Sequence, residues 1–128
     1  MHNQMPQEIE VWYIIPALRR ELAKCMVDFG LAQKQIAGRM EITEAAVSQY
    51  LSSKRAKEVT FGSAILNEIK KSAERIVKNK ESLVKEMVRL ASLTSVKHVM
   101  CDLHKKQDLS LNGCNICFDS SLIKISKV

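Results

Sequence analysis

The stretch from Gln33 to Arg55, QKQIAGRMEITEAAVSQYLSSKR, constrains the fold more than any other part of this 128-residue chain. Ile36, Ala37 and Met40 mark the apolar face of a short first helix. Thr43 is placed to cap a second helix. The inward stripe of that second helix consists of Ala46, Val47, Tyr50 and Leu51. Two short helices joined by a tight turn, the second with small and polar residues outside, are typical of a DNA-binding helix-turn-helix.

The same residues resemble a known family. The Ile36-Ala37 pair and the run ITEAAVSQYLSSKR are similar to helix-turn-helix regulators of the Cro/XRE type. The upstream run VWYIIPALRRELAKCMVDFGLAQKQIA and the cysteine-bearing tail resemble, in particular, small archaeal and bacterial predicted transcriptional regulators. The resemblance implies a sequence-specific DNA-binding regulator with an all-α fold.

Two positions depart from the family pattern. Glu41 stands in the turn where members usually carry Gly, and a non-Gly residue at positive φ costs roughly 1 to 2 kcal/mol. Ala32 stands where a Ser or Thr normally caps the first motif helix, and a lost cap costs about 1 kcal/mol. Neither change removes a residue expected to face DNA.

The outward positions of the second helix are the candidate readers of base edges. They are Thr43, Glu44, Ala45, Ser48, Gln49 and Ser52. Gln49 suits adenine or a bridge between two bases, Glu44 suits the amino group of cytosine, and Ala45 suits the methyl group of thymine. Contacts to phosphates are expected from Gln33, Lys34, Lys54, Arg55 and Lys57.

Composition and charge support a polyanionic partner. The formal net charge is +6, the sequence pI is about 9.3 and 46% of the residues are hydrophobic, as suits a folded domain. No apolar run approaches the roughly 20 residues of a membrane span, and MHNQMPQEIE lacks the features of a signal peptide. A cytoplasmic protein without a membrane partner is expected. Neither a catalytic arrangement nor a glycine-rich phosphate loop is evident, so an enzyme is not expected.

The segment before the motif predicts a scaffold helix. Pro16 should begin this helix or kink a longer one, and Gly30 should end it. Its apolar stripe is predicted from Leu18, Leu22, Met26 and Phe29. Its other faces carry Arg19, Arg20, Glu21 and Lys24. Cys25, beside the stripe, is interpreted as a small buried thiol, or alternatively as a redox-reactive thiol or extra metal ligand.

A long helical stretch follows, from Ala64 to about Leu93, with a break expected near Asn79 to Ser82. Its apolar face predicts either packing on the N-terminal helices or a homodimer interface, and both can hold. The whole chain is therefore expected to be all-α. Its predicted divisions are a DNA-binding domain at 8–60, a helical linker and dimerisation segment at 61–96, and a metal-binding tail at 97–128.

The tail carries four possible metal ligands. Cys101 and His104 form a C-x2-H pair, and Cys114 and Cys117 form a C-x2-C pair. A Cys3His set is a normal tetrahedral zinc site, and the same ligands can hold an iron-sulfur cluster. Incidental, metal-free thiols are the simpler alternative.

The function expected from these features is that of a homodimeric regulator reading two operator half-sites about 34 Å apart. The metal tail would be a structural zinc site or an iron-sulfur sensor. Two other classes stay open: an antitoxin-like protein-interaction module, and a redox carrier that uses the helical domain for protein interaction.

Overall fold

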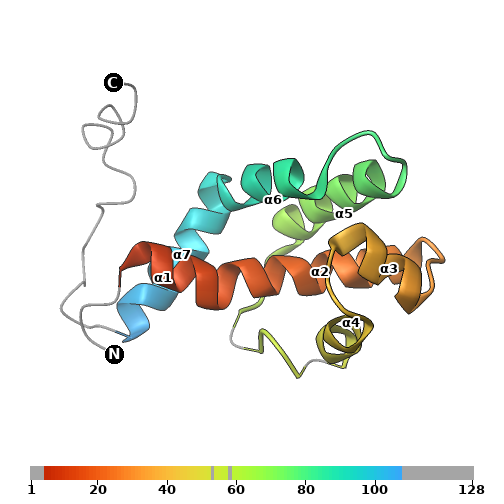
Figure 1. Ribbon diagram of the computed structural model, residues 1–128. Coiled ribbons are helices and arrows are strands. Elements are labelled where there is room, and N and C mark those ends of the chain that lie inside the picture. The colour runs from red at the N-terminus through yellow and green to blue at the C-terminus, as the bar shows by residue number, and fades with distance from the viewer. Residues whose placement is uncertain (1–4, 53, 58, 108–128) are drawn as a thin grey trace.

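The computed structural model describes residues 5–52, 54–57 and 59–107, and this part of the chain is helical throughout its regular elements (Figure 1). The elements are α1 (Pro6–Ile9), a π-helical turn (Glu10–Ile14), α2 (Ile15–Asp28), α3 (Gln33–Met40), α4 (Glu44–Leu51), α5 (Ser63–Val77), α6 (Leu83–Ala91) and α7 (Thr94–Gln107). The all-α prediction is thus confirmed for the described residues.

The first three elements form one continuous helix (Figure 1). A π-turn interrupts its regular α-helical pattern just before Pro16. Proline lacks an N–H, and its ring crowds the carbonyl four residues earlier, at Trp12. The N–H of Ile15 donates to the carbonyl of Glu10, five residues earlier, and not to the residue four earlier as in an α-helix. This bond defines the π-turn. Pro16 was predicted either to begin a helix or to kink a longer one. The structure shows a longer helix whose regular pattern is interrupted by a π-turn just before Pro16.

The core runs along this helix with one irregular step. Its large, fully buried side chains are Ile9, Ile14, Leu18, Leu22 and Met26. The first interval is five residues and the others are four, because the π-turn adds one residue to a turn. The inclusion of Phe29 in this stripe was wrong. α2 ends at Asp28, and Phe29 caps it with 39% of its surface exposed, just before Gly30 at a φ of 91°.

α3 and α4 occupy the two helical stretches expected between Gln33 and Arg55, and both pack against α2. Glu41 ends α3 in the left-handed region, at φ 55° and ψ 40°, which confirms that the turn holds a non-Gly residue at positive φ. At the start of α3, the N–H of Ala32 donates to Oε1 of Gln35 at 2.8 Å. This bond satisfies the backbone group at Ala32 without a Ser or Thr cap.

α5 packs along α2, and its predicted apolar face is covered within the chain. The buried members of that face are Ile65, Ile69, Ala73 and Ile76. The chain leaves α5 through Asn79, at a φ of 58°, and re-enters a helix after Ser82, so the expected break is confirmed. Intrachain packing of this face is therefore confirmed.

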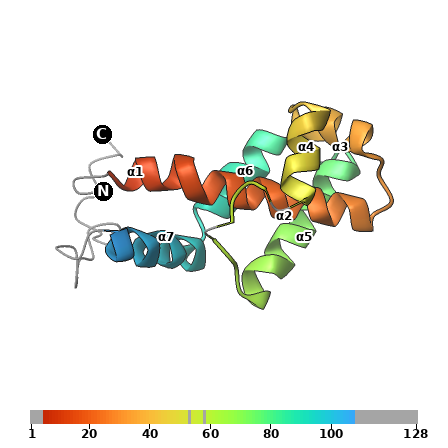
Figure 2. The same ribbon diagram turned by 90° about the horizontal axis from the view of Figure 1, so that it is seen from below.

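α7 runs back beside α1, at the opposite end of the molecule from α3 and α4 (Figure 2). The helix begins at Thr94 and ends at Gln107, so it passes through the expected boundary at 97 without interruption. The first predicted metal-ligand pair consequently lies on a regular helix.

Candidate nucleic-acid interface

The outer face of α4 is small, polar and exposed. Glu44, Ala45 and Ser48 all project into solvent. Thr43 is exposed as well, but its side-chain oxygen accepts the N–H of Ala46 at 3.1 Å and caps the helix. Glu44, Ala45 and Ser48 therefore have side chains open to an incoming surface, whereas the hydroxyl of Thr43 is engaged in holding the helix start.

Gln49 is half-buried and joined to the basic residues that follow α4. Its Oε1 accepts a hydrogen bond from Nε of Arg55, whose guanidinium lies 5.5 Å from the centre of the Tyr50 ring. The amide nitrogen of Gln49 still has donor capacity, but paired donation and acceptance with adenine requires the Arg55 contact to rearrange. The last predicted reader, Ser52, is exposed and donates from Oγ to the carbonyl of Gln49 at 3.2 Å.

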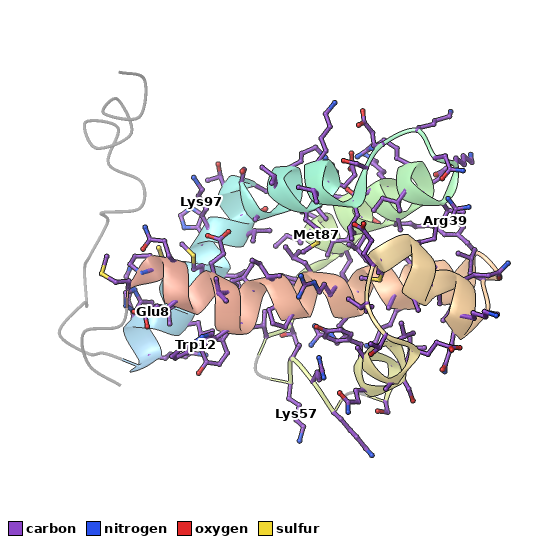
Figure 3. The ribbon with its side chains drawn as sticks, in the orientation of Figure 1. Glu8, Trp12, Arg39, Lys57, Met87 and Lys97 are labelled. Atoms are coloured by element: carbon purple, nitrogen blue, oxygen red, sulfur yellow. The ribbon has the colours of Figure 1, made fainter. Side chains whose placement is uncertain are left out.

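A basic segment leads directly away from α4. Lys54, Arg55 and Lys57 are all exposed, and Lys57 points away from the helices in Figure 3. The N–H of Lys54 donates to the carbonyl of Gln49 at 2.9 Å, which fixes how the chain leaves the helix. Three exposed cations thus follow α4 along the chain, and Arg55 contacts the side chains of Gln49 and Tyr50.

Arg20 anchors this basic segment from beneath. Arg20 is 6% exposed, and its guanidinium donates to the carbonyl of Ala56 and, at 2.8 Å, to the carbonyl of Val59. Ala56 has a φ of 61°, so the chain turns sharply where it meets the guanidinium. Arg20 was expected on a face of the scaffold helix other than the apolar stripe, and the structure shows that the segment after α4 covers this face. Its acceptors are backbone carbonyls 36 and 39 residues along the chain, for which the sequence of α2 carries no signal.

Gln33 and Lys34 occupy the first turn of α3, and both side chains are exposed. A helix N-terminus presents unpaired backbone N–H groups and favours anions. This end of α3 therefore has the chemistry expected of a phosphate contact.

The tail residues divide into two groups. Cys101 and His104 lie one turn apart on α7, and both are half-buried. Cys114 and Cys117 lie outside the described residues. Within the described ranges, no group of three or more His, Cys, Asp or Glu side chains is arranged to hold a metal ion.

Cys25 is half-buried on α2. Burial raises the pKa of its thiol above the ordinary value of 9.0, and the carboxylates of Asp28 and Glu21 raise it further against an opposing effect of Lys70. The thiolate is therefore disfavoured at neutral pH, which argues against a reactive thiol at this position.

No helix in the described part of the chain is long and apolar enough to cross a membrane. A scan against protein-family models found no match, and searches of curated proteins and of solved structures found none either. The described residues define a helical fold in which a short helix pair carries an exposed polar face and an anchored basic segment. Any more particular function has to rest on those residues.

Proposed function

We propose that this chain is a sequence-specific DNA-binding transcriptional regulator that acts as a homodimer. The observation that carries the proposal is the continuity of two surfaces. The exposed face of α4 leads directly into three exposed cations, on a segment that Arg20 anchors.

In the proposed complex α4 enters the major groove, where each base pair shows a distinct pattern of donors and acceptors. Glu44, Ala45 and Ser48 face the base edges, and the amide of Gln49 joins them. Lys54, Arg55 and Lys57 neutralise phosphates along one strand, and Gln33 and Lys34 contact the backbone at the start of α3. The net charge of +6 favours the approach to DNA.

A homodimer follows from the small reach of one helix. A single α4 contacts too few base pairs for useful specificity, whereas two copies related by a two-fold axis read two half-sites. The operator is expected to be a near-palindrome whose half-sites lie about one helical turn apart.

The proposal also includes a metal site in the tail, built from Cys101, His104, Cys114 and Cys117. The i, i+3 spacing of the first pair on α7 places a thiolate and an imidazole on the same side of one helix, as two ligands of one ion require. When bound, zinc would tie the tail to α7, whereas an iron-sulfur cluster would add a redox-sensitive group. Anaerobic purification with zinc, iron and sulfide analysis separates these two outcomes. Absence of all three would remove the metal site from the proposal.

The DNA proposal is tested by selecting a binding sequence from random duplexes and measuring its affinity by fluorescence anisotropy across salt concentrations. Lys54→Gln, Arg55→Gln and Lys57→Gln should each lower the slope of log K against log salt by about 0.9. Lys80→Gln is the matched control, because Lys80 is also exposed but lies in the α5–α6 connection. Ser48→Ala should instead change which sequence is preferred.

No binding at low salt, or an equal loss of slope in Lys80→Gln, would reject the DNA-binding role of this face. Binding without sequence preference would reject the regulator and leave a non-specific DNA-binding protein.

A further inference from the structure

A shallow groove of about 190 Å³ separates the first long helix from α6. One wall carries Glu10, Ile15 and Arg19, and the other carries Val84, Met87 and Val88. Met87 lies between α6 and α2 in Figure 3. Ligand pockets typically enclose about 300 to 1,000 Å³, so this groove suits inserted side chains rather than a metabolite.

The α6 wall leaves apolar surface in solvent. Val84 and Val88 are 65% and 61% exposed and lie one helical turn apart. On α5, by contrast, the apolar face is buried against α2. Single exposed apolar side chains are ordinary, but two neighbouring valines beside a groove form a continuous apolar strip.

The other wall owes its composition to the π-turn. In a regular α-helix, residues five apart lie about 140° apart around the axis. Here the N–H of Ile15 donates to the carbonyl of Glu10, so Ile15 lies about one turn above Glu10 on the same side. Arg19 follows four residues later, one regular turn beyond Ile15.

The charged residues on this wall can pair with those on the same wall of a second copy. Glu10 lies at one end, Arg19 at the other, and Ile15 between them. Within residues 5–52, 54–57 and 59–107, the structure records no ion pair for either charged side chain. A two-fold axis near Ile15 would set each Glu10 against the opposite Arg19, twice over.

From these features we infer that the groove between α2 and α6 is the contact surface for a second copy of this chain. The two copies cross antiparallel at Ile15. The apolar strip of each copy, Val84 and Val88, packs against the other copy beside that contact. The groove contains no residue of α4, so both polar faces stay accessible. The inference names the interface that the proposed homodimer requires, and in that respect it rests on the proposed function.

The test is a charge exchange, read by sedimentation equilibrium in the absence of DNA. Glu10→Arg and Arg19→Glu should each weaken the dimer about tenfold or more, because each places like charges together at two symmetric positions. The double variant Glu10→Arg/Arg19→Glu should recover most of the wild-type dimer constant. Lys24→Glu, an exposed reversal on α2 outside the groove, should leave that constant unchanged. Circular dichroism is used to check that every variant folds.

A crosslink gives an independent measurement. Ile15→Cys should form an intermolecular disulfide rapidly, whereas Val27→Cys, exposed near the far end of α2, should not. A monomeric wild type, unchanged dimerisation in both single variants, or a double variant weaker than either single would overturn the inference. Operator binding is measured separately. A dimer that uses this groove but ignores DNA would refute the function alone, and a DNA-binding dimer indifferent to these changes would refute the interface alone.

Discussion

The guanidinium of Arg75 donates two hydrogen bonds, at 2.8 and 3.2 Å, to one carboxylate oxygen of Glu86, a residue only 3% exposed. Arg89 reaches the same oxygen at 3.3 Å and also donates to the hydroxyl of Ser72. Burial alone would raise the pKa of Glu86, but hydrogen bonds from Arg75, Ser72 and Arg89 outweigh it and lower the pKa from 4.5 to about 2. A buried carboxylate therefore joins α5 to α6.

This pKa predicts a specific loss of stability in acid. Because the folded pKa lies below the unfolded one, the contribution of Glu86 is complete above about pH 4.5 and disappears as the pH falls through 2. At 1.36 kcal/mol per unit, the loss is about 3 kcal/mol. Urea unfolding at a series of pH values should show it in the wild type and not in Glu86→Gln.

The matched control for that series is Glu81→Gln. Glu81 pairs with Lys85 at 3.3 Å on the surface, and such pairs contribute at most about 1 kcal/mol. An acid transition equally steep in Glu86→Gln would show that another group is responsible.

Glu41→Gly should stabilise the protein by about 1 kcal/mol, because glycine adopts the left-handed conformation without a steric cost. Gly30→Ala, at a φ of 91°, should have the opposite effect. Chemical denaturation measures both. A destabilised Glu41→Gly would mean that the glutamate side chain contributes more than its backbone strain costs.

Arg20→Met should release the basic segment. Loss of the two carbonyl contacts should raise the rate of tryptic cleavage after Lys54, Arg55 and Lys57 by at least about tenfold, since even one hydrogen bond to a charged group contributes about 1.5 to 3 kcal/mol. Mass spectrometry of the peptides identifies each cut. If the proposed function holds, operator affinity should fall with it, although no side chain of the proposed DNA-binding face is changed.

Two comparisons keep the Arg20 result specific. Lys24→Met removes an exposed cation from the same helix and should leave cleavage of the segment unchanged. Faster cleavage at Lys71, within α5, by the same factor would instead indicate global unfolding.

Cys25 should be alkylated more slowly than an unstructured cysteine at pH 8, because its raised pKa reduces the thiolate fraction. Asp28→Asn should speed the reaction by removing one of the charges that raise the pKa. Iodoacetamide labelling resolved by peptide mass spectrometry measures the rate at this residue alone. Identical rates in the two proteins would assign the effect to burial.

Local patterns were sufficient for part of this structure. The bounds of α3 and α4, the non-Gly turn at Glu41 and the break after α5 follow from apolar spacing, caps and turn chemistry within a few residues. The burial of Arg20 and Glu86 does not follow from such patterns. Their partners lie on other elements. Sequence patterns alone assign a charged residue to the solvent-exposed surface, because they do not show which elements pack against it.

The candidate site also has features that the sequence predicts and features that it does not. The outward positions of α4 are set by helical periodicity, so Glu44, Ala45 and Ser48 are exposed as expected. The contacts made by Gln49 and Thr43 depend on where their neighbours point, and the spacing of the sequence does not contain that information.

The widened turn before Pro16 amounts to a one-residue insertion in an otherwise regular helix, and it sets the rotational phase of everything before it. Ile9 faces the core and Glu10 shares a side with Ile15 through the same extra residue. Removing one residue from this turn would rotate the N-terminal segment by about 100° and misplace both faces at once. A change of length here would therefore disturb both the core contact of Ile9 and the proposed contact between two copies at Ile15.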